Sequence, residues 1–314
     1  MLVTGSSGWL GSVLVPRLVS LGHEVIGLDP VAAPTTRVRG TVADADCVRR
    51  TCSDYAIEAI VHAGALHKPQ VATHSASAFV DTNVHGTLNV LEAAVAGGSR
   101  VTRVVFTSTT SLMIARDFRA EVARRGKAHW LTEHHAPLAP RNIYGTTKLV
   151  AEHLCRMFHE QHALPIVVLR TGRFFPEEDD MAHTIPQSGP NTKTNELLFR
   201  RLTVEDAAEA HVAALDAAPR LGFDTFIVAA RTPFREEDCA ALWSDAPAVV
   251  ERYFPQYTTI YRRLGWTMFA SIDRVYATTH AERRLGFVCR TGFAEKLTEL
   301  DHSQQHAWPE RDDA

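Results

Sequence analysis

The chain has 314 residues, a formal net charge of −3, and 45% hydrophobic and 22% charged residues, which is the balance of an ordinary globular protein. That charge gives no basic footprint for nucleic acid or an anionic membrane surface, and no apolar run is long enough for a membrane helix. The five cysteines include no CxxC pair, and the sixteen histidines lack the spacing of zinc motifs. We therefore expect a reduced, cytoplasmic protein with no metal site and no signal peptide.

The first predicted strand, residues 1–4, leads through a glycine-spaced turn into a predicted helix over 9–21. Gly5 permits the turn, Gly8 lets the backbone approach a pyrophosphate, and Gly11 lets helix and strand pack closely. The helix N-terminus adds unpaired N–H groups and a partial positive charge. A plain turn is the alternative. We expect this turn to hold a dinucleotide through Gly5, Ser7, Gly8, Trp9, Leu10 and Gly11.

The second predicted strand, residues 24–28, is followed by Asp29. Dinucleotide-binding folds place a carboxylate at this distance from the glycines, where it binds the adenosine ribose. A 2′-phosphate would be repelled by Asp29, and no Arg or Lys follows before Arg37. The pattern predicts NAD rather than NADP as the cofactor. The alternative is a solvated acid at the end of a strand.

Strand-like runs alternate with helical periods along the first two thirds of the chain. The further strands are predicted at 59–62, 101–107, 165–169 and 225–229, and the further helices at 44–53, 77–96 and 144–162. This alternation predicts an α/β fold, a doubly wound parallel (Rossmann) sheet that binds ligands beyond the carboxyl ends of its strands. Two more segments follow directly after strands, as that rule requires: 63–65 and Ser108-Thr109.

The regular alternation ends after Arg170. Residues 174–200 are rich in Pro, Gly, Asn and acids, and 235–295 show little periodicity, with a helical return over 202–215 between them. We expect an NAD-binding domain over 1–173, to which 202–230 returns. A smaller C-terminal substrate lobe is expected from 174–201 and 231–300, followed by a polar tail over 301–314.

Tyr144 and Lys148 lie four residues apart on one face of the helix predicted over 144–162. Tyrosine is a poor acid–base at neutral pH, and a lysine ammonium one turn away would favour the phenolate, as would a positive nicotinamide ring. Lys148 would also hold the nicotinamide ribose. Thr109 or Ser108 would hydrogen-bond the substrate oxygen and direct its proton toward Tyr144. The alternative is a helix-start aromatic followed by a solvated charge.

Together these motifs resemble the extended short-chain dehydrogenase/reductase family, the NAD-dependent epimerase/dehydratase group. The resemblance runs through most of the chain. It rests on Thr4-Gly5-x-x-Gly8-x-x-Gly11, Asp29, Asp44, His62-Ala-Gly-Ala65, Asn83-x-x-Gly86-Thr87-x-Asn89, Phe106-Thr-Ser-Thr109, Glu133…Pro137…Pro140…Tyr144-x-x-x-Lys148, and Ser271-Ile-Asp273 to Leu285-Gly-Phe287.

The resemblance implies that Asp44 contacts the adenine amino group, and that Thr109 takes the role of the family's serine. Tyr144 would be the catalytic acid–base and Lys148 its partner. Asn83 would support the active-site helix or a water relay, with a core amide as the alternative. The cofactor would also contact Ala63, Gly64, Ala65, Asn83, Thr107, Tyr144 and Lys148.

Departures from the family pattern concern the substrate. Thr110-Ser111 carries no carboxylate where sugar-nucleotide dehydratases have an Asp-Glu pair, which disfavours 4,6-dehydration. The segment 110–143 is longer than usual and basic, which indicates a lid or substrate loop, or simply a solvated basic helix. The family's Asn before the substrate lobe is replaced by Arg173, which would bind a phosphate or carboxylate or form a salt bridge to 177–180. We expect substrate phosphates at Arg173, Arg263 and Arg274.

The leading hypothesis is an NAD-dependent enzyme that oxidises a secondary alcohol of a sugar nucleotide or related activated sugar to a transient ketone, with 4-epimerisation the commonest outcome in the family. A simple NAD-dependent dehydrogenase of a non-nucleotide substrate is the second hypothesis. A non-catalytic NAD sensor is the third, although such relatives typically lose the Tyr or the Lys. The resemblance implies a homodimer through the helices over 77–96 and 144–162, since such helices form this contact in many family members; the alternative is that their apolar faces belong to the core.

Overall fold

The structure, a computed structural model, describes residues 1–174 and 187–302. Seven parallel strands form its main sheet, in the order β3-β2-β1-β4-β5-β7-β8. Their bounds are β1 Leu2–Thr4, β2 Ile26–Asp29, β3 Val38–Arg39, β4 Ala59–His62, β5 Arg103–Thr109, β7 Ile166–Thr171 and β8 Phe223–Val228. The predicted doubly wound parallel sheet is confirmed, and all six predicted strands are present within about two residues of their expected ends.

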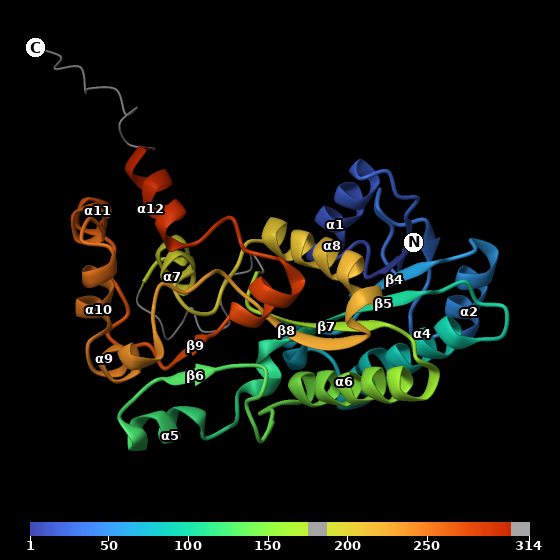
Figure 1. Cartoon of the computed structure of the whole chain (residues 1–314), viewed down its shortest axis with the longest axis horizontal. Helices are drawn as coiled ribbons and strands as arrows, with labels where there is room; N and C mark the ends of the chain where they lie inside the picture. The colour runs from blue at the N-terminus through green and yellow to red at the C-terminus, as the bar shows by residue number, and fades with distance from the viewer. Residues whose placement is uncertain (175–186, 303–314) are drawn as a thin grey trace, which may run out of the picture.

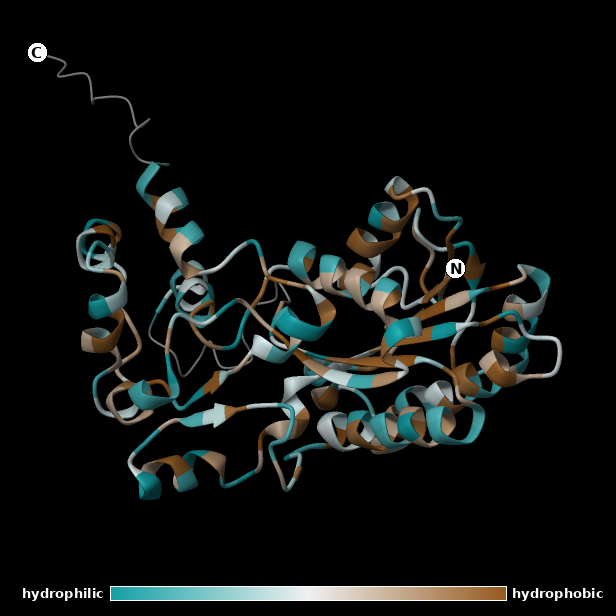
Figure 2. Ribbon diagram, viewed as in Figure 1, coloured by the Kyte–Doolittle hydropathy of each residue, from teal (hydrophilic) through white to brown (hydrophobic). Residues whose placement is uncertain are grey.

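Helices cover both faces of this sheet (Figure 1). Helices α1 (Trp9–Ser20) and α8 (Val204–Leu221) pack on one face. Helices α2 (Ala45–Asp54), α4 (Gly86–Val95) and α6 (Ile143–His162) pack on the other. Figure 2 shows the apolar strands running between these layers. Burial on both faces explains why the strands are near-continuous apolar runs rather than alternating ones.

The helix predicted over 77–96 is interrupted. It consists of α3 (Ala76–Phe79), a π-helical turn η2 (Val80–His85) and α4. π-Turns inside helices occur frequently at functional sites, and this one contains the buried Asn83.

The C-terminal region holds more regular structure than its sequence indicates. Short helices and strands surround a separate hydrophobic cluster that includes Phe199, Leu242, Tyr261 and Phe293. They are α7 Gly189–Glu196, η4 Glu236–Asp238, α9 Cys239–Ser244, α10 Ala246–Tyr253, α11 Tyr257–Leu264, β9 Arg274–Tyr276 and α12 Phe293–His302. The remaining element, η5 Ala281–Leu285, packs instead on the core of the main sheet through Ala281 and Leu285. Helices of six to ten residues show too few turns for a clear period, which is why 235–295 looked irregular.

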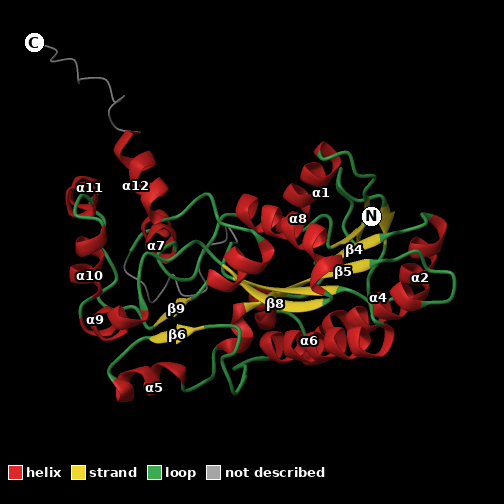
Figure 3. Cartoon of the chain, in the orientation of Figure 1, coloured by secondary structure: helices red, strands yellow, loops and turns green. Residues whose placement is uncertain are grey.

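The long segment after β5 is also ordered. It forms η3 (Thr110–Met113), α5 (Phe118–Arg125) and β6 (His129–Leu131), and β6 pairs in parallel with β9 (Figure 3). Helix α5 has an exposed Arg125–Glu121 ion pair and a left-handed C-cap at Gly126. The pairing with β9 attaches this segment to the C-terminal region.

Within residues 1–174 and 187–302, no helix combines the length and apolar content needed to cross a bilayer. The same described residues contain no group of three or more His, Cys, Asp or Glu placed to hold a metal ion.

Candidate active site

The glycine turn adopts the geometry that its sequence predicts. Gly5 has a φ of +74°, and a Cβ there would lie 2.8 Å from the Gly64 nitrogen. A Cβ at Gly11 would lie 2.3 Å from the Gly5 oxygen, so α1 packs on the turn at a distance that only glycine permits. Gly8 is the N-cap of α1 and provides no capping side chain. The N–H groups of the first turn of α1 are therefore available to an anion such as a pyrophosphate.

Side chains from two loops brace this turn. The Asp29 carboxylate accepts hydrogen bonds from the backbone N–H groups of Ser7 (3.1 Å) and Val31 (2.8 Å). The Ser7 hydroxyl donates to the Val31 carbonyl and contacts Thr36. Thr35 donates to the Ser6 carbonyl. Asp29 thus lies directly beside the glycine turn, where the ribose contact was expected, and the bracing Thr35 and Thr36 were not foreseen from sequence.

Some of the other expected cofactor residues lie against the glycine turn, and others have polar partners elsewhere in the structure. The segment after β4 lies against the glycine turn, and the Gly64 N–H donates to the Thr4 hydroxyl at 3.0 Å. Asp44 caps α2 by accepting from the Cys47 N–H, and Thr107 contacts His211 at 2.7 Å.

Leu10 is a core residue, so only its backbone is available to a ligand. Trp9 is partly exposed, and its indole N–H donates to the Phe174 carbonyl across the chain. Ala63 and Ala65 flank Gly64.

The structure corrects the expectation that Asn83 contacts the cofactor. Its amide oxygen accepts from the Leu66 N–H, while its amide nitrogen donates to the Leu66 carbonyl and the Thr147 hydroxyl. Both N–H groups are used, and the side chain is buried. Asn83 therefore joins the segment after β4 to α6, which is the supporting role left open as an alternative.

The proposed catalytic residues converge at the carboxyl end of β5. Thr109 is the last residue of β5, and Tyr144 lies in the first turn of α6, which Asn142 caps by accepting from the Gly145 N–H. Thr109 forms a side-chain hydrogen bond with Tyr144. Lys148 lies one turn further along α6, with its Nζ 4.0 Å from the centroid of the Phe106 ring. All three are buried.

Burial dominates the electrostatics of this centre. It raises the pKa of Tyr144 to about 12, an effect that the Thr109 hydrogen bond opposes. Burial also lowers the pKa of Lys148 to about 7, although Cys155 and Glu152 act in the other direction. Because burial lowers the pKa of Lys148 to about 7, its charge, and with it any attraction for the phenolate, is partly lost near neutral pH. Lys148 therefore needs the second contribution that the sequence predicts, a positive nicotinamide ring, to favour the Tyr144 phenolate.

Ser108 is turned away from the catalytic residues, which corrects its assignment to the substrate site. Ser108 is 2% exposed, and its hydroxyl donates to Glu152. Glu152 in turn forms a buried ion pair with Arg170, at 3.0 Å from Nε and 2.7 Å from a terminal nitrogen. Arg170 also donates to the Glu133 carbonyl. Thr109 is therefore the β5 hydroxyl beside Tyr144. In the sequence, one feature could have pointed to the role of Glu152: it follows Lys148 by one helical turn and so lies on the same face of α6.

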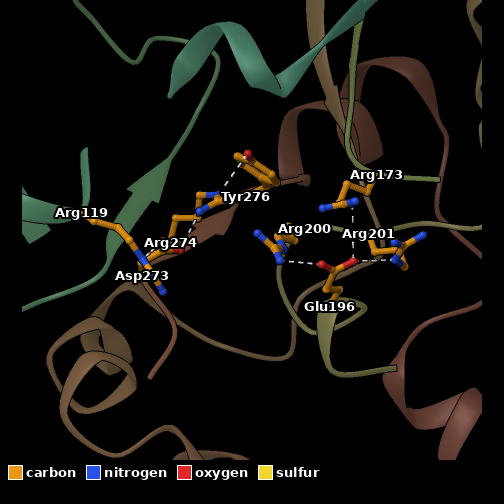
Figure 4. Close-up of polar contacts among 8 residues, drawn as sticks. All are labelled: Arg119, Arg173, Glu196, Arg200, Arg201, Asp273, Arg274 and Tyr276. Atoms are coloured by element: carbon orange, nitrogen blue, oxygen red, sulfur yellow. Dashed lines mark hydrogen bonds and ion pairs between the residues drawn. The ribbon is translucent and has the colours of Figure 1, made fainter. Parts of the chain in front are cut away.

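A cluster of arginines lies beyond the carboxyl ends of β5 and β7 (Figure 4). Arg173 follows β7, whose last residue pairs in register with Thr109. Arg173, Arg200 and Arg201 surround the fully buried Glu196, with the Arg201 Nε at 2.7 Å and the Arg173 Nε at 3.8 Å. Burial alone would raise the pKa of Glu196, but the three guanidinium groups outweigh it and hold that pKa below its usual value.

Arg274 belongs to the same region. Its guanidinium pairs with Asp273 at 2.7 Å and donates to the Tyr276 hydroxyl, and Asp273 also pairs with Arg119 of α5 (Figure 4). No pattern in the sequence singles out Glu196, Arg200 and Arg201. They are recognised only in the structure, where the arginines converge on the Glu196 carboxylate. The alternative salt bridge from Arg173 to 177–180 lies outside the described residues.

Arg263 does not join this cluster. It lies on α11, where it pairs with Asp301 of α12 at 3.0 Å and donates to the Leu300 carbonyl. In Figure 1, α11 lies at the far end of the molecule from β5 and β7. The expectation that Arg263 binds a substrate phosphate is therefore corrected.

The fold, the glycine turn and the Thr109–Tyr144–Lys148 centre define a dinucleotide-dependent enzyme of the short-chain dehydrogenase/reductase type. Residues 1–228 match the model of the NAD dependent epimerase/dehydratase family, and the chain belongs to that family. Its cofactor is accordingly NAD. The residues of the site fit this cofactor, because the glycine turn, the open N-terminus of α1 and the Asp29 carboxylate lie together.

Individual relatives are more distant. A UDP-glucose 4-epimerase of Streptomyces lividans is 30% identical over 176 residues, which cover 53% of this chain and 49% of that protein. The chain spans about half the length of the first curated relatives it matches. Among solved structures, the UDP-glucose 4-epimerase of Thermotoga maritima with UDP-glucose has a TM-score of 0.66 at 18% identity, covering 97% and 98% of the two chains. A glucuronic acid dehydrogenase from Chromohalobacter salexigens has a TM-score of 0.61 at 20% identity, covering 99% and 91%.

Proposed function

We propose that this protein oxidises a secondary alcohol of a sugar nucleotide or related activated sugar to a transient ketone, and that the net reaction is a 4-epimerisation. The observation that carries the proposal is the hydrogen-bonded pair Thr109–Tyr144 at the end of β5, with Lys148 one turn along the same helix. Family membership and the relatives named as UDP-glucose 4-epimerases support it.

In this reaction Tyr144 removes the proton of the substrate hydroxyl, and Thr109 orients that hydroxyl by hydrogen bonding. Bound NAD supplies the hydride acceptor. For Tyr144 to act near neutral pH, its pKa, which burial raises to about 12, must fall. A cationic Lys148 and a positively charged ring nearby would both lower it. The pKa of Lys148, about 7, rises if it hydrogen-bonds a ribose as a cation.

The substrate is proposed to be anionic and to bind through Arg173, Arg200 and Arg274. The first two adjoin the end of β7, and the Nε of Arg200 is buried without a hydrogen-bond partner in the described part of the chain. A planar guanidinium in that situation suits a phosphate or carboxylate oxygen. Either group of an activated sugar would complete this site.

Three further proposals concern the domains, the oligomeric state and the location of the protein. We infer an NAD-binding domain over 1–173 and 202–230, a substrate lobe from 174–201 and 231–300, and a tail over 301–314. The separate hydrophobic cluster of the C-terminal region supports that division. A homodimer through α4 and α6 is proposed because Val150 and Met157, two turns apart on α6, are exposed. A cytoplasmic location is proposed from the cysteine pattern.

The first test is to denature the purified protein and assay the supernatant for nicotinamide cofactor. About one equivalent of NAD is expected, because an epimerase regenerates its cofactor in every cycle. The protein is then incubated with UDP-glucose, UDP-galactose and dTDP-glucose, and the products are examined by NMR. Epimer formation by the wild type, lost in Tyr144→Phe with NAD still bound, supports the proposal. An inactive wild type that holds NAD would contradict it for these substrates.

The second candidate is an NAD-dependent dehydrogenase of a small acidic sugar. The observation that favours it is Arg173, which stands where the family has an Asn that helps hold a nucleotide diphosphate. The glucuronic acid dehydrogenase with the same fold is consistent with it. A steady rise of NADH absorbance with glucuronate and added NAD, without epimer formation from sugar nucleotides, would establish this candidate instead.

A further inference from the structure

A cavity lies outside the catalytic centre, beside the segment over 110–143, which is longer than usual in the family. Its volume is about 550 Å³, and α5, β6, the loop over 135–139 and the start of α9 form its walls. This volume falls within the range of small-molecule sites. Neither Thr109 nor Tyr144 nor Lys148 is among the residues that line it. The three proposed catalytic residues therefore form no part of its walls.

His129 carries the argument for a ligand. This side chain is 9% exposed and lines the cavity, and its Nε2 is buried without a hydrogen-bond partner among the described residues. Its Nδ1 lies 3.5 Å from a terminal nitrogen of Arg125, which can only donate, so a neutral ring carries its proton on Nε2. Burial lowers the pKa of His129, which favours that neutral ring. A buried N–H group therefore lacks an acceptor, a situation that costs free energy unless a ligand or water supplies one.

The nearest acceptor defines the missing group. A Glu121 carboxylate oxygen lies 3.7 Å from the His129 Nε2, beyond hydrogen-bond distance, and it also pairs with Arg125. A hydroxyl group can accept from the imidazole N–H and donate to the carboxylate at once, which a carboxylate or an ammonium group cannot do. His135 lies beside His129, with ring centroids 6.1 Å apart, and burial lowers its pKa too. It offers a second neutral partner.

The remaining walls disfavour charged ligands and add apolar surface. The charged residues that line the cavity are of both signs: Arg125, Lys127, Asp117, Glu121 and Glu236. An anion would meet the carboxylates and a cation the guanidinium, so neither gains a consistent field. Trp130 and Phe118 also line the cavity. Aromatic rings provide apolar faces for the C–H surface of a ring-shaped ligand. A neutral ligand with several hydroxyls matches all of these walls.

We propose that this cavity is a binding site for a neutral carbohydrate of one or two sugar rings, in which a sugar hydroxyl bridges His129 and Glu121. The site is separate from the one that holds NAD and the reacting sugar. It gives the lengthened segment over 110–143 a function of its own, as a second recognition surface attached to the substrate lobe through the β6–β9 pairing.

The test uses the full-length protein saturated with NAD. Saturation-transfer NMR and calorimetry measure binding of D-glucose, D-galactose, maltose and lactose, with glucuronate and glucosamine as charged comparisons. We expect saturable binding of at least one neutral sugar. His129→Ala and the isosteric Glu121→Gln are expected to weaken its Kd about tenfold or more, since each removes a buried hydrogen bond. The exposed His153→Ala on α6 is the matched control and leaves the Kd unchanged.

Tyr144→Phe separates this site from the catalytic one and must also leave the Kd unchanged. Circular dichroism confirms that each variant is folded, and Glu121→Gln retains the shape of the side chain. Three results would overturn the proposal: no saturable binding of any neutral sugar, binding of the charged sugars alone, or a Kd that neither His129→Ala nor Glu121→Gln changes. If only water fills the cavity, no neutral sugar will show saturable binding.

Discussion

Replacing Glu152 by alanine leaves the Arg170 guanidinium buried without its carboxylate. In the structure both side chains are 8% exposed, and they share three hydrogen bonds of 2.7 to 3.2 Å. The Ser108 hydroxyl loses its acceptor as well. Breaking a buried ion pair from one side typically costs about 3–5 kcal/mol, because one charge is left uncompensated. We expect Glu152→Ala to lower the free energy of unfolding by that amount.

Urea unfolding of the NAD-free protein, followed by circular dichroism, measures this change, with m compared between variants to confirm that the same transition is observed. Glu160→Gln on the exposed side of α6 is the control, expected to change stability by less than about 0.5 kcal/mol. The double variant Glu152→Ala/Arg170→Met is expected to be more stable than Glu152→Ala, because it removes the orphaned charge. A loss below about 1 kcal/mol for Glu152→Ala, or a double variant that is less stable still, would refute the reasoning.

Three further predictions concern the cofactor and the catalytic centre. Tyr144→Phe should abolish turnover and change the Kd for NAD less than about threefold; retained turnover would exclude Tyr144 as the acid–base. Since burial lowers the pKa of Lys148 to about 7, the folded NAD-free protein binds fewer protons than the unfolded chain above that pH. Its stability relative to Lys148→Met should therefore rise between about pH 7 and 10, by up to about 1.4 kcal/mol per pH unit, in urea titrations; a flat difference would contradict the assigned burial. Gly11→Ala should destabilise the protein and weaken NAD binding measured by calorimetry, because its Cβ would lie 2.3 Å from a backbone oxygen, whereas Gly97→Ala, where a Cβ meets nothing within 4 Å, should do neither.

The sequence determined the parts of this protein that depend on local pattern. Apolar runs separated by helical periods fix a parallel sheet with helices on both faces, because strands buried on both sides must be apolar throughout. The glycine turn, Asp29 and the Tyr144–Lys148 pair are read at fixed spacings along one strand or one helix, and the structure brings them to the same edge of the sheet.

Tertiary structure decided which polar side chains meet. Ser108 and Thr109 are neighbours in the chain, yet one reaches Glu152 inside the protein and the other Tyr144, because successive strand residues point to opposite faces. Arg173 and Arg263 are equally basic in the sequence, but only Arg173 joins Glu196. Such pairs are set by long-range packing and by the cost of burying charge alone, neither of which leaves a periodic signal in the chain.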